Sequence, residues 1–178
     1  LAGGVALNCV ANGKLIKERI FDQIWIQPAS GDAGGSLGAA LGAYHMLLDR
    51  PRHIHPLNKD NMNGSYLGPE YTQDQIIKQL DESGAIYEVL SDSSLIEKTA
   101  TALATGKAIG WVQGRMEFGP RALGNRSVIA DPRSPAMQST LNLKVKYRES
   151  FRPFAPIVLR EHASEYFDIA PQHDSPYM

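Results

Sequence analysis

The densest group of side chains capable of chemistry lies between residues 113 and 152. Eight basic side chains against three acidic ones give this stretch a charge of +5, inside a chain whose net charge is −1. The planar fork of arginine pairs with phosphate or carboxylate oxygens, and glycine lets a loop wrap a small ligand. The basic residues are Arg115, Arg121, Arg126, Arg133, Lys144, Lys146, Arg148 and Arg152. The pattern favours a small phosphorylated ligand, with a nucleic-acid surface and a solvated basic face as alternatives.

Two glycine-rich turns near the start of the chain suit a nucleotide. Gly3 and Gly4 precede an expected helix, where free backbone N–H groups can meet an anion, and Asn8 can offer its amide to a ribose or base. Asp32 stands just before a glycine-rich helix start, where its carboxylate can hold the metal that accompanies phosphates. The structural alternatives are a tight turn capped by Asn8, and an Asp32 N-cap followed by glycines that allow close helix packing.

The histidines and the cysteine carry less information. His53 and His55 flank one residue in a polar stretch, and such a pair is usually exposed rather than bound to a metal. Cys9 is the only cysteine, so an internal disulfide is excluded and a reducing compartment fits. We expect Cys9 to be a small buried apolar residue, because no basic partner that would make it a nucleophile stands nearby.

Strand–turn–helix units are expected to position these residues. The first part of the chain predicts the end of a strand at 1–2, a helix over 5–18, a strand over 24–27 and a helix over 34–48. Residues 49–71 are rich in Pro, Gly and Asn, and they predict a linker between two domains.

A second α/β unit is expected after the linker. Thr72 with Gln75 predicts a capping box, and so does Ser94 with Glu97, whose helix should end at Gly106. Two further helices are expected over 134–143 and 161–167. The expected strands cover 86–90, 108–113, 128–130 and 155–159, and the expected loops cover 114–126 and 144–153.

Length and composition define the broad class. The chain has 178 residues, of which 43% are hydrophobic and 21% charged, as is typical of a soluble globular protein. No run approaches the ~18 consecutive apolar residues of a membrane helix, and no signal peptide opens the chain, so a cytoplasmic protein without a membrane partner is expected. Because it starts without methionine and stops without a helix ending or a polar tail, we expect a piece of a larger protein.

Four segments together resemble the NodU/CmcH-type O-carbamoyltransferases. They are Gly3–Asn8, Gly31–Gly42, Gly110–Asp131 and Leu141–Pro156, and the string from Gln113 to Ser127 is the most specific. The resemblance implies an α/β protein with the end of an actin/Hsp70-like ATPase domain over 1–48, a linker over 49–71, and a YrdC-like α/β domain with a mixed sheet over 72–178. It implies an enzyme that activates carbamoyl phosphate with ATP as carbamoyl adenylate and transfers the carbamoyl group to a hydroxyl of a small acceptor.

The resemblance also implies roles for single residues. It makes Arg115, Lys146 and Arg148 catalytic, and it makes Arg121, Ser127 and Arg152 ligands of substrate and phosphate. It makes Gly3, Gly4, Asn8, Gly34 and Gly35 nucleotide-binding, and Asp32 a ligand of a divalent metal, with iron expected and magnesium as an alternative. The family's two metal-binding histidines, in an HxxxH motif, have no counterpart here, so we expect this piece alone to be inactive in carbamoyl transfer.

The sequence leaves other functions open. A tRNA-modification or hydrogenase-maturation relative would use similar domains on a different acceptor, and a nucleic-acid-binding module would use the basic loops. For the carbamoyltransferase, the basic loops would offset the repulsion between two anionic substrates. Catalysis would then rest on positioning and electrostatic stabilisation, without a nucleophilic side chain.

Overall fold

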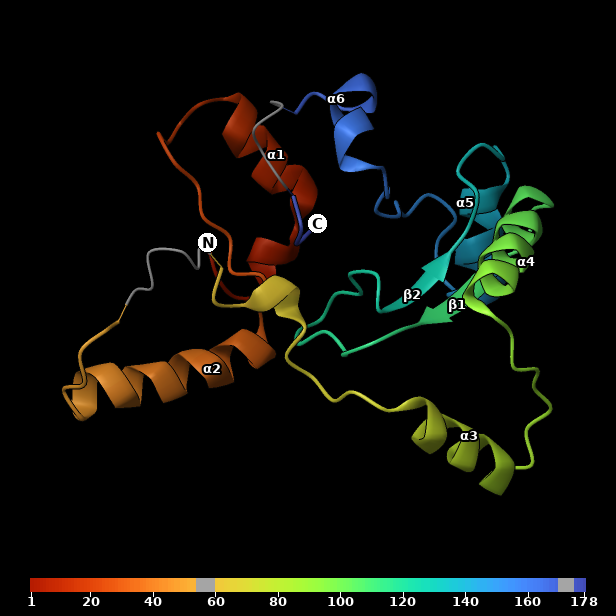
Figure 1. The fold of residues 1–178 in the computed structure, drawn as a ribbon. Coiled ribbons are helices and arrows are strands. Elements are labelled where there is room, and N and C mark those ends of the chain that lie inside the picture. The colour runs from red at the N-terminus through yellow and green to blue at the C-terminus, as the bar shows by residue number, and fades with distance from the viewer. Residues whose placement is uncertain (54–59, 170–174) are drawn as a thin grey trace. The chain divides into compact units, whose positions relative to one another are not determined.

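The computed structural model describes residues 1–53, 60–169 and 175–178 (Figure 1). His55 and the rest of the expected linker between 54 and 59 lie outside the described residues.

The chain divides by its internal contacts into two compact units. Unit 1 comprises Leu1–Glu70, Gly114–Asn125 and Pro176–Met178, and unit 2 comprises Tyr71–Gln113 and Arg126–Ser175. The loop that follows Gln113 thus belongs to unit 1, although the residues on both sides of it belong to unit 2. This division by contacts does not test the expected domain boundaries at 48 and 72, which stay a prediction.

Unit 1 is built from short helices. A 3-10 turn, η1 (Gly4–Leu7), leads into α1 (Cys9–Lys17). The helix α2 (Asp32–Gly42) continues as a π-helical turn, η2 (Ala43–Leu47), and a second 3-10 turn, η3, covers Asn63–Ser65.

Three expectations about the start of the chain need correction. The helix over 5–18 is divided at Asn8, because the Asn8 Oδ1 accepts the Ala11 N–H at 3.1 Å and begins a new helix. The segment over 24–27 exchanges two hydrogen bonds with Leu1, at 2.6 and 3.0 Å, but no strand forms there in the described residues. Cys9 is exposed, since α1 buries Asn12 instead, whose Nδ2 donates to a backbone carbonyl at 2.8 Å.

Ala29 is a point of very close backbone packing in unit 1. It is fully buried, and Gly34 of α2 and Gly119 both lie against it. A methyl group on Gly34 would overlap the Ala29 carbonyl oxygen, and one on Gly119 would lie 3.2 Å from the Ala29 Cα. Gly119 also has a φ of 123°, a left-handed value that disfavours any side chain. The sequence therefore needs glycine at both positions to bring the backbone segments together.

The loop at 114–125 folds around the carboxylate of Glu117. This residue is only 4% exposed, and its Oε1 accepts the backbone N–H groups of Leu123 and Asn125, each at 2.8 Å. The Asn125 side chain in turn donates to the Arg115 carbonyl oxygen at 2.7 Å. A buried carboxylate is stable only when such donors replace the water that it has lost. The loop is therefore closed by one acidic side chain.

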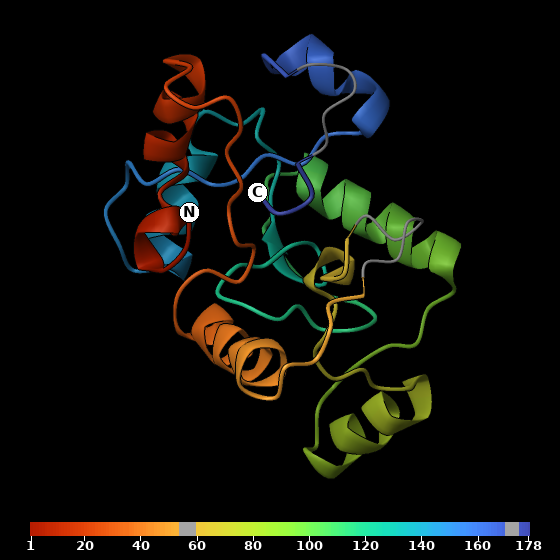
Figure 2. The same cartoon turned by 90° about the vertical axis from the view of Figure 1, so that its left-hand side faces the viewer.

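The same loop is hydrogen-bonded to η3 and the residue that follows it. The Phe118 N–H donates to the Ser65 carbonyl oxygen at 2.6 Å, and the Tyr66 hydroxyl donates to the Leu123 carbonyl oxygen at 3.1 Å. In both Figure 1 and Figure 2 the yellow η3 lies beside this blue-green loop. Unit 1 is thus held together by contacts between segments far apart in the sequence.

Asp60 holds the end of the chain in unit 1. Its carboxylate accepts the Tyr177 hydroxyl and the N–H groups of Met62 and Gly64, the latter two at 2.9 and 3.0 Å. Burial would raise the pKa of Asp60, but these hydrogen bonds outweigh it and leave the pKa lowered. Burial and the hydrogen bond to Asp60 raise the pKa of Tyr177 to about 12.

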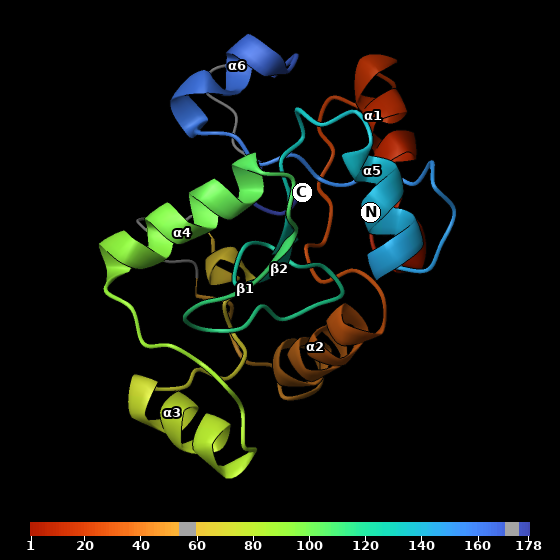
Figure 3. The same cartoon turned by 90° about the vertical axis from the view of Figure 1, so that its right-hand side faces the viewer.

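Unit 2 contains a two-stranded sheet with a helix beside it (Figures 1 and 3). The strands β1 (Ile109–Val112) and β2 (Arg126–Ile129) pair antiparallel, with Ile109 opposite Ile129. The helix α4 (Asp92–Ala104) contacts β1. The other elements are α3 (Gln73–Glu82), α5 (Met137–Thr140), the π-helical turn η4 (Leu141–Val145), the 3-10 turn η5 (Arg160–His162) and α6 (Ala163–Tyr166).

Local helix signals in unit 2 had mixed outcomes. The capping box of Thr72 and Gln75 is confirmed, with hydrogen bonds in both directions at 3.3 and 2.9 Å. The box expected at Ser94 is wrong, because Ser91 caps α4 and accepts the Ser94 N–H at 3.4 Å. Gly106 follows α4 with the left-handed φ of 81° that a C-terminal glycine was expected to supply.

The α/β class is confirmed, but the mixed sheet is not, since the described strands form one antiparallel pair. The segments over 86–90 and 155–159 are not strands, because the described residues provide no neighbouring strand for their backbone groups. The helix expected to begin at 134 starts at Met137, where no side chain caps it, and the strand expected at 128–130 starts earlier, at Arg126. The ATPase-like and YrdC-like descriptions stay predictions.

Asn142 anchors the basic loop that follows η4. It is fully buried, and its Nδ2 donates to the carbonyl oxygens of Ser150 and Arg152, at 3.0 and 2.8 Å. Its Oδ1 accepts the Arg148 Nε–H at 2.6 Å. One amide side chain therefore fixes three positions of this loop.

Apolar burial is sparse in the described part of the chain. The buried apolar residues there are Ala6, Ala29, Met137 and Leu141. Both units therefore depend strongly on buried polar side chains such as Glu117 and Asn142. Within the described ranges, every helix is too short or too polar to cross a membrane.

Replacement of Asn142 by alanine is expected to lower the free energy of unfolding by about 2 kcal/mol, because the three hydrogen bonds of the buried Asn142 amide are lost. Gln138 provides a matched control, since its exposed amide donates to the same loop at Phe151 and Arg152, both at 3.1 Å. Q138A should cost less than about 1 kcal/mol. Urea unfolding followed by circular dichroism measures both variants, and equal losses would contradict the anchoring role of Asn142.

The contact between Tyr177 and Asp60 is expected to give a pH dependence at the alkaline end. Because the pKa of Tyr177 is raised from 10.0 to about 12 in the folded chain, its stabilising contribution is complete below pH 10 and is lost as the pH rises to 12. The difference in unfolding free energy between wild type and Y177F should therefore shrink over this range, by on the order of 1 kcal/mol after allowance for solvent screening. A difference that stays constant between pH 9 and 12 would refute this expectation.

Candidate functional site

An open cleft in unit 1 brings the early glycine motifs together. Its volume is about 470 Å³, and it is lined by Gly4, Leu7, Ser30, Gly31, Asp32, Ala33, Gly119 and Pro120. The first glycine turn, the turn before α2 and the loop at 114–125 each contribute to it. The structure thus gathers two of the motifs on which the nucleotide prediction depended, and it adds Gly119 and Pro120 from the third.

The described residues that line this cleft include three glycines, Gly4, Gly31 and Gly119. Gly31 lines the cleft and has a left-handed φ of 97°. Gly3, which precedes Gly4 but is not among the lining residues, has a φ of 73°. A residue with a side chain would adopt either value only with strain. Gly31 is also the N-cap of α2, so the first turn of an eleven-residue helix starts at the cleft. The first N–H groups of a helix have no partner within it, and with the helix dipole they favour an anion.

Among the described residues, Asp32 is the one acidic residue that lines the cleft. It is the first residue of α2, and its side chain is exposed. No group of three His, Cys, Asp or Glu side chains that could hold a metal occurs among the described residues. A carboxylate is the kind of donor that hard divalent cations accept, and metal binding by Asp32 stays a prediction.

Two of the predicted nucleotide ligands have structural roles instead of lining the cleft. Asn8 caps α1, which was the structural alternative for this residue. Gly34 packs against Ala29, which was the structural alternative for the glycines of α2. Gly35 has open space where a side chain would stand, but it does not line the cleft either. For all three residues, nucleotide binding stays a prediction.

The two arginines of unit 1 bind backbone carbonyl groups. Arg121 donates to the carbonyl oxygen of Leu7, a cleft residue, at 2.9 Å. Arg115 donates to the Gly68 carbonyl oxygen at 2.8 Å and pairs with Glu70 at 3.2 Å, where both side chains are about half exposed. Both guanidinium groups thus hold the backbone of unit 1, and their predicted contacts with phosphate stay a prediction.

The remaining predicted substrate ligands lie in unit 2. Arg148 is fixed between Asn142 and the ring of Phe154, whose centroid lies 5.0 Å from the guanidinium carbon. The Nε of Arg152 donates to Glu149 at 2.8 Å, and this hydrogen bond lowers the pKa of Glu149. Lys146, two residues before Arg148 in the chain, is exposed.

Ser127 lies apart from these side chains in the chain, on β2, where it is half-buried opposite Trp111. The basic residues are therefore divided, with Arg115 and Arg121 in unit 1 and the others in unit 2. That they all share one cavity stays a prediction.

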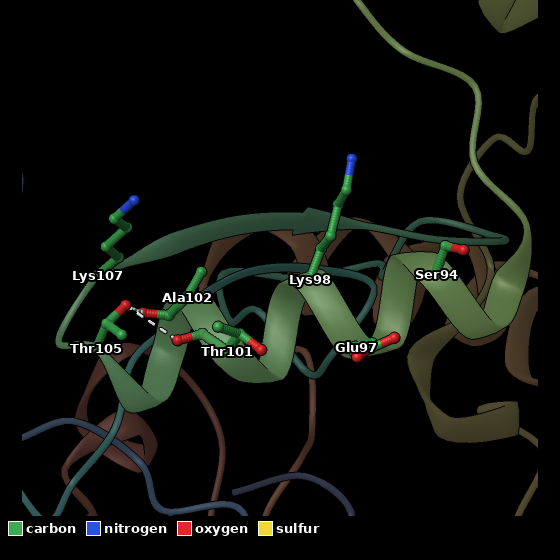
Figure 4. A pocket seen from close by; sticks show the side chains of 7 residues that line it. All are labelled: Ser94, Glu97, Lys98, Thr101, Ala102, Thr105 and Lys107. Atoms are coloured by element: carbon green, nitrogen blue, oxygen red, sulfur yellow. Dashed lines mark hydrogen bonds between the residues drawn. The ribbon is translucent and has the colours of Figure 1, made fainter.

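A second hollow follows the exposed face of α4 (Figure 4). Its volume is about 580 Å³, and it is lined by Ser94, Glu97, Lys98, Thr101, Ala102, Thr105 and Lys107. Lys98 and Lys107 extend away from the helix in this view, and Lys98 pairs with Glu88 at 2.7 Å. Thr105 donates to the carbonyl oxygens of its own helix at 3.0 Å. No set of polar groups converges on a ligand position here, so the cleft of unit 1 is the candidate site.

Sequence reasoning missed the importance of Glu117. It was counted only as one of three acidic residues in a basic stretch. Its neighbours Met116 and Phe118 are apolar, and an acidic residue between two apolar ones in an arginine-rich loop is the signal that could have indicated burial.

Comparison with known proteins agrees with the resemblance. Residues 1–41 match the family model of the carbamoyltransferase N-terminus, and residues 100–178 match that of the carbamoyltransferase C-terminus. An uncharacterised protein of Synechocystis sp. is 56% identical over 180 residues, covering 100% of this chain and 29% of that protein. Nodulation protein NolNO of Sinorhizobium fredii is 45% identical over 170 residues, covering 95% of this chain and 24% of that protein.

A third relative, Nodulation protein U of Rhizobium tropici, is 37% identical over 178 residues. The match covers 100% of this chain and 28% of that protein, so the chain spans less than a third of the length of these relatives. The two family models match in the expected order, and their segments include the glycine turns and the basic loops. The chain belongs to the carbamoyltransferase family.

Proposed function

We propose that the protein activates carbamoyl phosphate with ATP as carbamoyl adenylate and transfers the carbamoyl group to a hydroxyl of a small acceptor. Family membership supports carbamoyl transfer in general. The observation that carries the nucleotide part is the cleft of unit 1, which is lined by Gly4, Gly31 and Gly119 and where α2 starts. Backbone N–H groups at such a position suit the phosphates of ATP.

Asp32 is proposed as the metal ligand of this cleft. Its exposed carboxylate at the first residue of α2 can hold a divalent cation, iron or magnesium, close to bound phosphates. Such a metal supplies a Lewis acid that polarises the carbamoyl carbonyl group. Its other ligands would be water, substrate or residues beyond those described.

The basic loop of unit 2 is proposed to bind carbamoyl phosphate. In the described part of the chain, neither the ammonium group of Lys146 nor the terminal nitrogens of Arg148 have a hydrogen-bond partner. Arg148 is already oriented by Asn142 and Phe154, so it loses little conformational freedom when it binds an anion. Arg152, Arg121, Arg115 and Ser127 are proposed to support the same substrates.

These residues would act through position and charge. Two anionic substrates repel each other, and nearby cations offset this repulsion most strongly where water is excluded. Formation of carbamoyl adenylate consumes one water and releases phosphate and pyrophosphate. The acceptor hydroxyl then displaces AMP from the carbonyl carbon. Neither step requires a nucleophilic side chain from the protein.

Occlusion of the cleft tests the nucleotide part of the proposal. Gly4 lines the cleft and a side chain there would meet only open space, so Gly4→Leu should fill the cleft without straining the backbone. We expect the dissociation constant of a non-hydrolysable ATP analogue, measured by isothermal titration calorimetry, to rise at least roughly tenfold.

Gly13→Leu is the matched control for this substitution. Gly13 also has open space at its Cβ position, but it lies in α1 and does not line the cleft. The control should bind the analogue like wild type. Unchanged binding by Gly4→Leu, or equal weakening by both substitutions, would remove the nucleotide from this cleft.

Removal of the Lys146 charge tests the carbamoyl phosphate part. K146A should weaken binding of fresh carbamoyl phosphate by roughly tenfold to a hundredfold, the scale of one hydrogen bond to a charged group. Its thermal unfolding should stay close to wild type, because the Lys146 side chain is exposed. K144A removes an equally exposed lysine two residues earlier and should leave the affinity nearly unchanged. Equal effects of the two substitutions would indicate non-specific attraction instead of a binding residue.

A further inference from the structure

One side of the cleft in unit 1 is supplied by a loop, and that loop has its own anchor. Gly119 and Pro120 line the cleft, and Gly119 packs against the fully buried Ala29. These residues lie at the tip of the loop at 114–125. A loop tip keeps a defined shape only if bonds within the loop fix it.

The anchor is the carboxylate of Glu117. Its Oε1 accepts the N–H groups of Leu123 and Asn125, both at 2.8 Å, and the residue is 4% exposed. Because Leu123 is drawn back to Glu117, the residues between them must form a turn. That turn contains the two cleft residues, Gly119 and Pro120.

The same turn is also bonded to a second segment that lines the cleft. Arg121 follows Pro120, and its guanidinium donates to the carbonyl oxygen of Leu7 at 2.9 Å. Leu7 ends η1 and lines the cleft together with Gly4. The loop thus contributes Gly119 and Pro120 to the lining, and Arg121 bonds it to a second lining segment.

We propose that Glu117 is a positioning residue of the cleft: by accepting two backbone N–H groups it shapes the turn that holds Gly119 and Pro120 as a wall and brings Arg121 to Leu7. Glu117 does not line the cleft, so it acts through these residues and not through contact with a ligand. The proposal deepens the proposed function, because the cleft is taken to bind a nucleotide.

Two substitutions separate the acceptor role of Glu117 from its charge. Glu117→Gln keeps an Oε1 that can accept the same two N–H groups, so its dissociation constant for the ATP analogue should stay within about threefold of wild type. Glu117→Ala removes the acceptor, and the constant should rise at least roughly tenfold. Equal weakening in both variants, or unchanged binding in Glu117→Ala, would overturn the proposal.

Met137→Ala controls for a general loss of stability. Met137 is 6% exposed and belongs to unit 2, so its truncation should lower the midpoint of thermal unfolding without altering the cleft of unit 1. All variants are compared at a temperature where circular dichroism shows them folded. If Met137→Ala weakens nucleotide binding as much as Glu117→Ala does, the effect of Glu117 is one of stability, and the positioning role is refuted.

Amide hydrogen exchange makes the test independent of the nucleotide. In Glu117→Ala the amides of Leu123 and Asn125 should exchange at least roughly tenfold faster than in wild type, whereas Glu117→Gln should protect them. If wild type binds no nucleotide, the proposed function fails, and exchange alone decides whether Glu117 shapes the turn. Unchanged protection of both amides in Glu117→Ala would overturn the positioning role even where nucleotide binding is intact.

Discussion

The arrangement of unit 1 depends on the burial of one carboxylate. A carboxylate removed from water is strongly unfavourable unless donors surround it. In unit 1 the donors include two backbone N–H groups of the same loop. The loop must therefore fold back on itself to bring these N–H groups to the Glu117 carboxylate. Gly119 can then approach Ala29 as closely as it does because neither the loop nor α2 places a side chain between them.

The sequence predicted those elements whose cause is local. The capping box at Thr72 and the glycine after α4 need only neighbouring residues, and both are present. Ser91 and Ser94 offer the same hydroxyl within one turn, so composition could not decide which of them caps the helix. The segments over 86–90 and 155–159 have strand-like composition, but a strand also needs a partner, and sequence pattern does not reveal one.

The candidate site shows the same division between local and non-local causes. Residues of both glycine turns, with Asp32, line one cleft, and their binding of a nucleotide and a metal stays a prediction. The arginines could not be placed from charge and spacing alone, because a guanidinium group binds a backbone carbonyl as readily as a phosphate. Arg121 and Arg115 bind carbonyl groups 114 and 47 residues away in the chain. These carbonyl partners can be identified only from the folded conformation of the loop at 114–125.

The division of the chain between the units has a consequence for the order of folding. A ribosome releases α3, α4 and β1 before it releases the loop that completes the cleft of unit 1. Contacts such as Tyr66–Leu123 and Leu7–Arg121 span 57 and 114 residues, and closure of such long loops costs chain entropy and slows folding. During synthesis, the lining residues between Gly4 and Ala33 therefore lack their partner loop until the first part of unit 2 has been made. The cleft is completed only when Gly119 and Pro120 have been added, although its six other lining residues precede unit 2 in the chain.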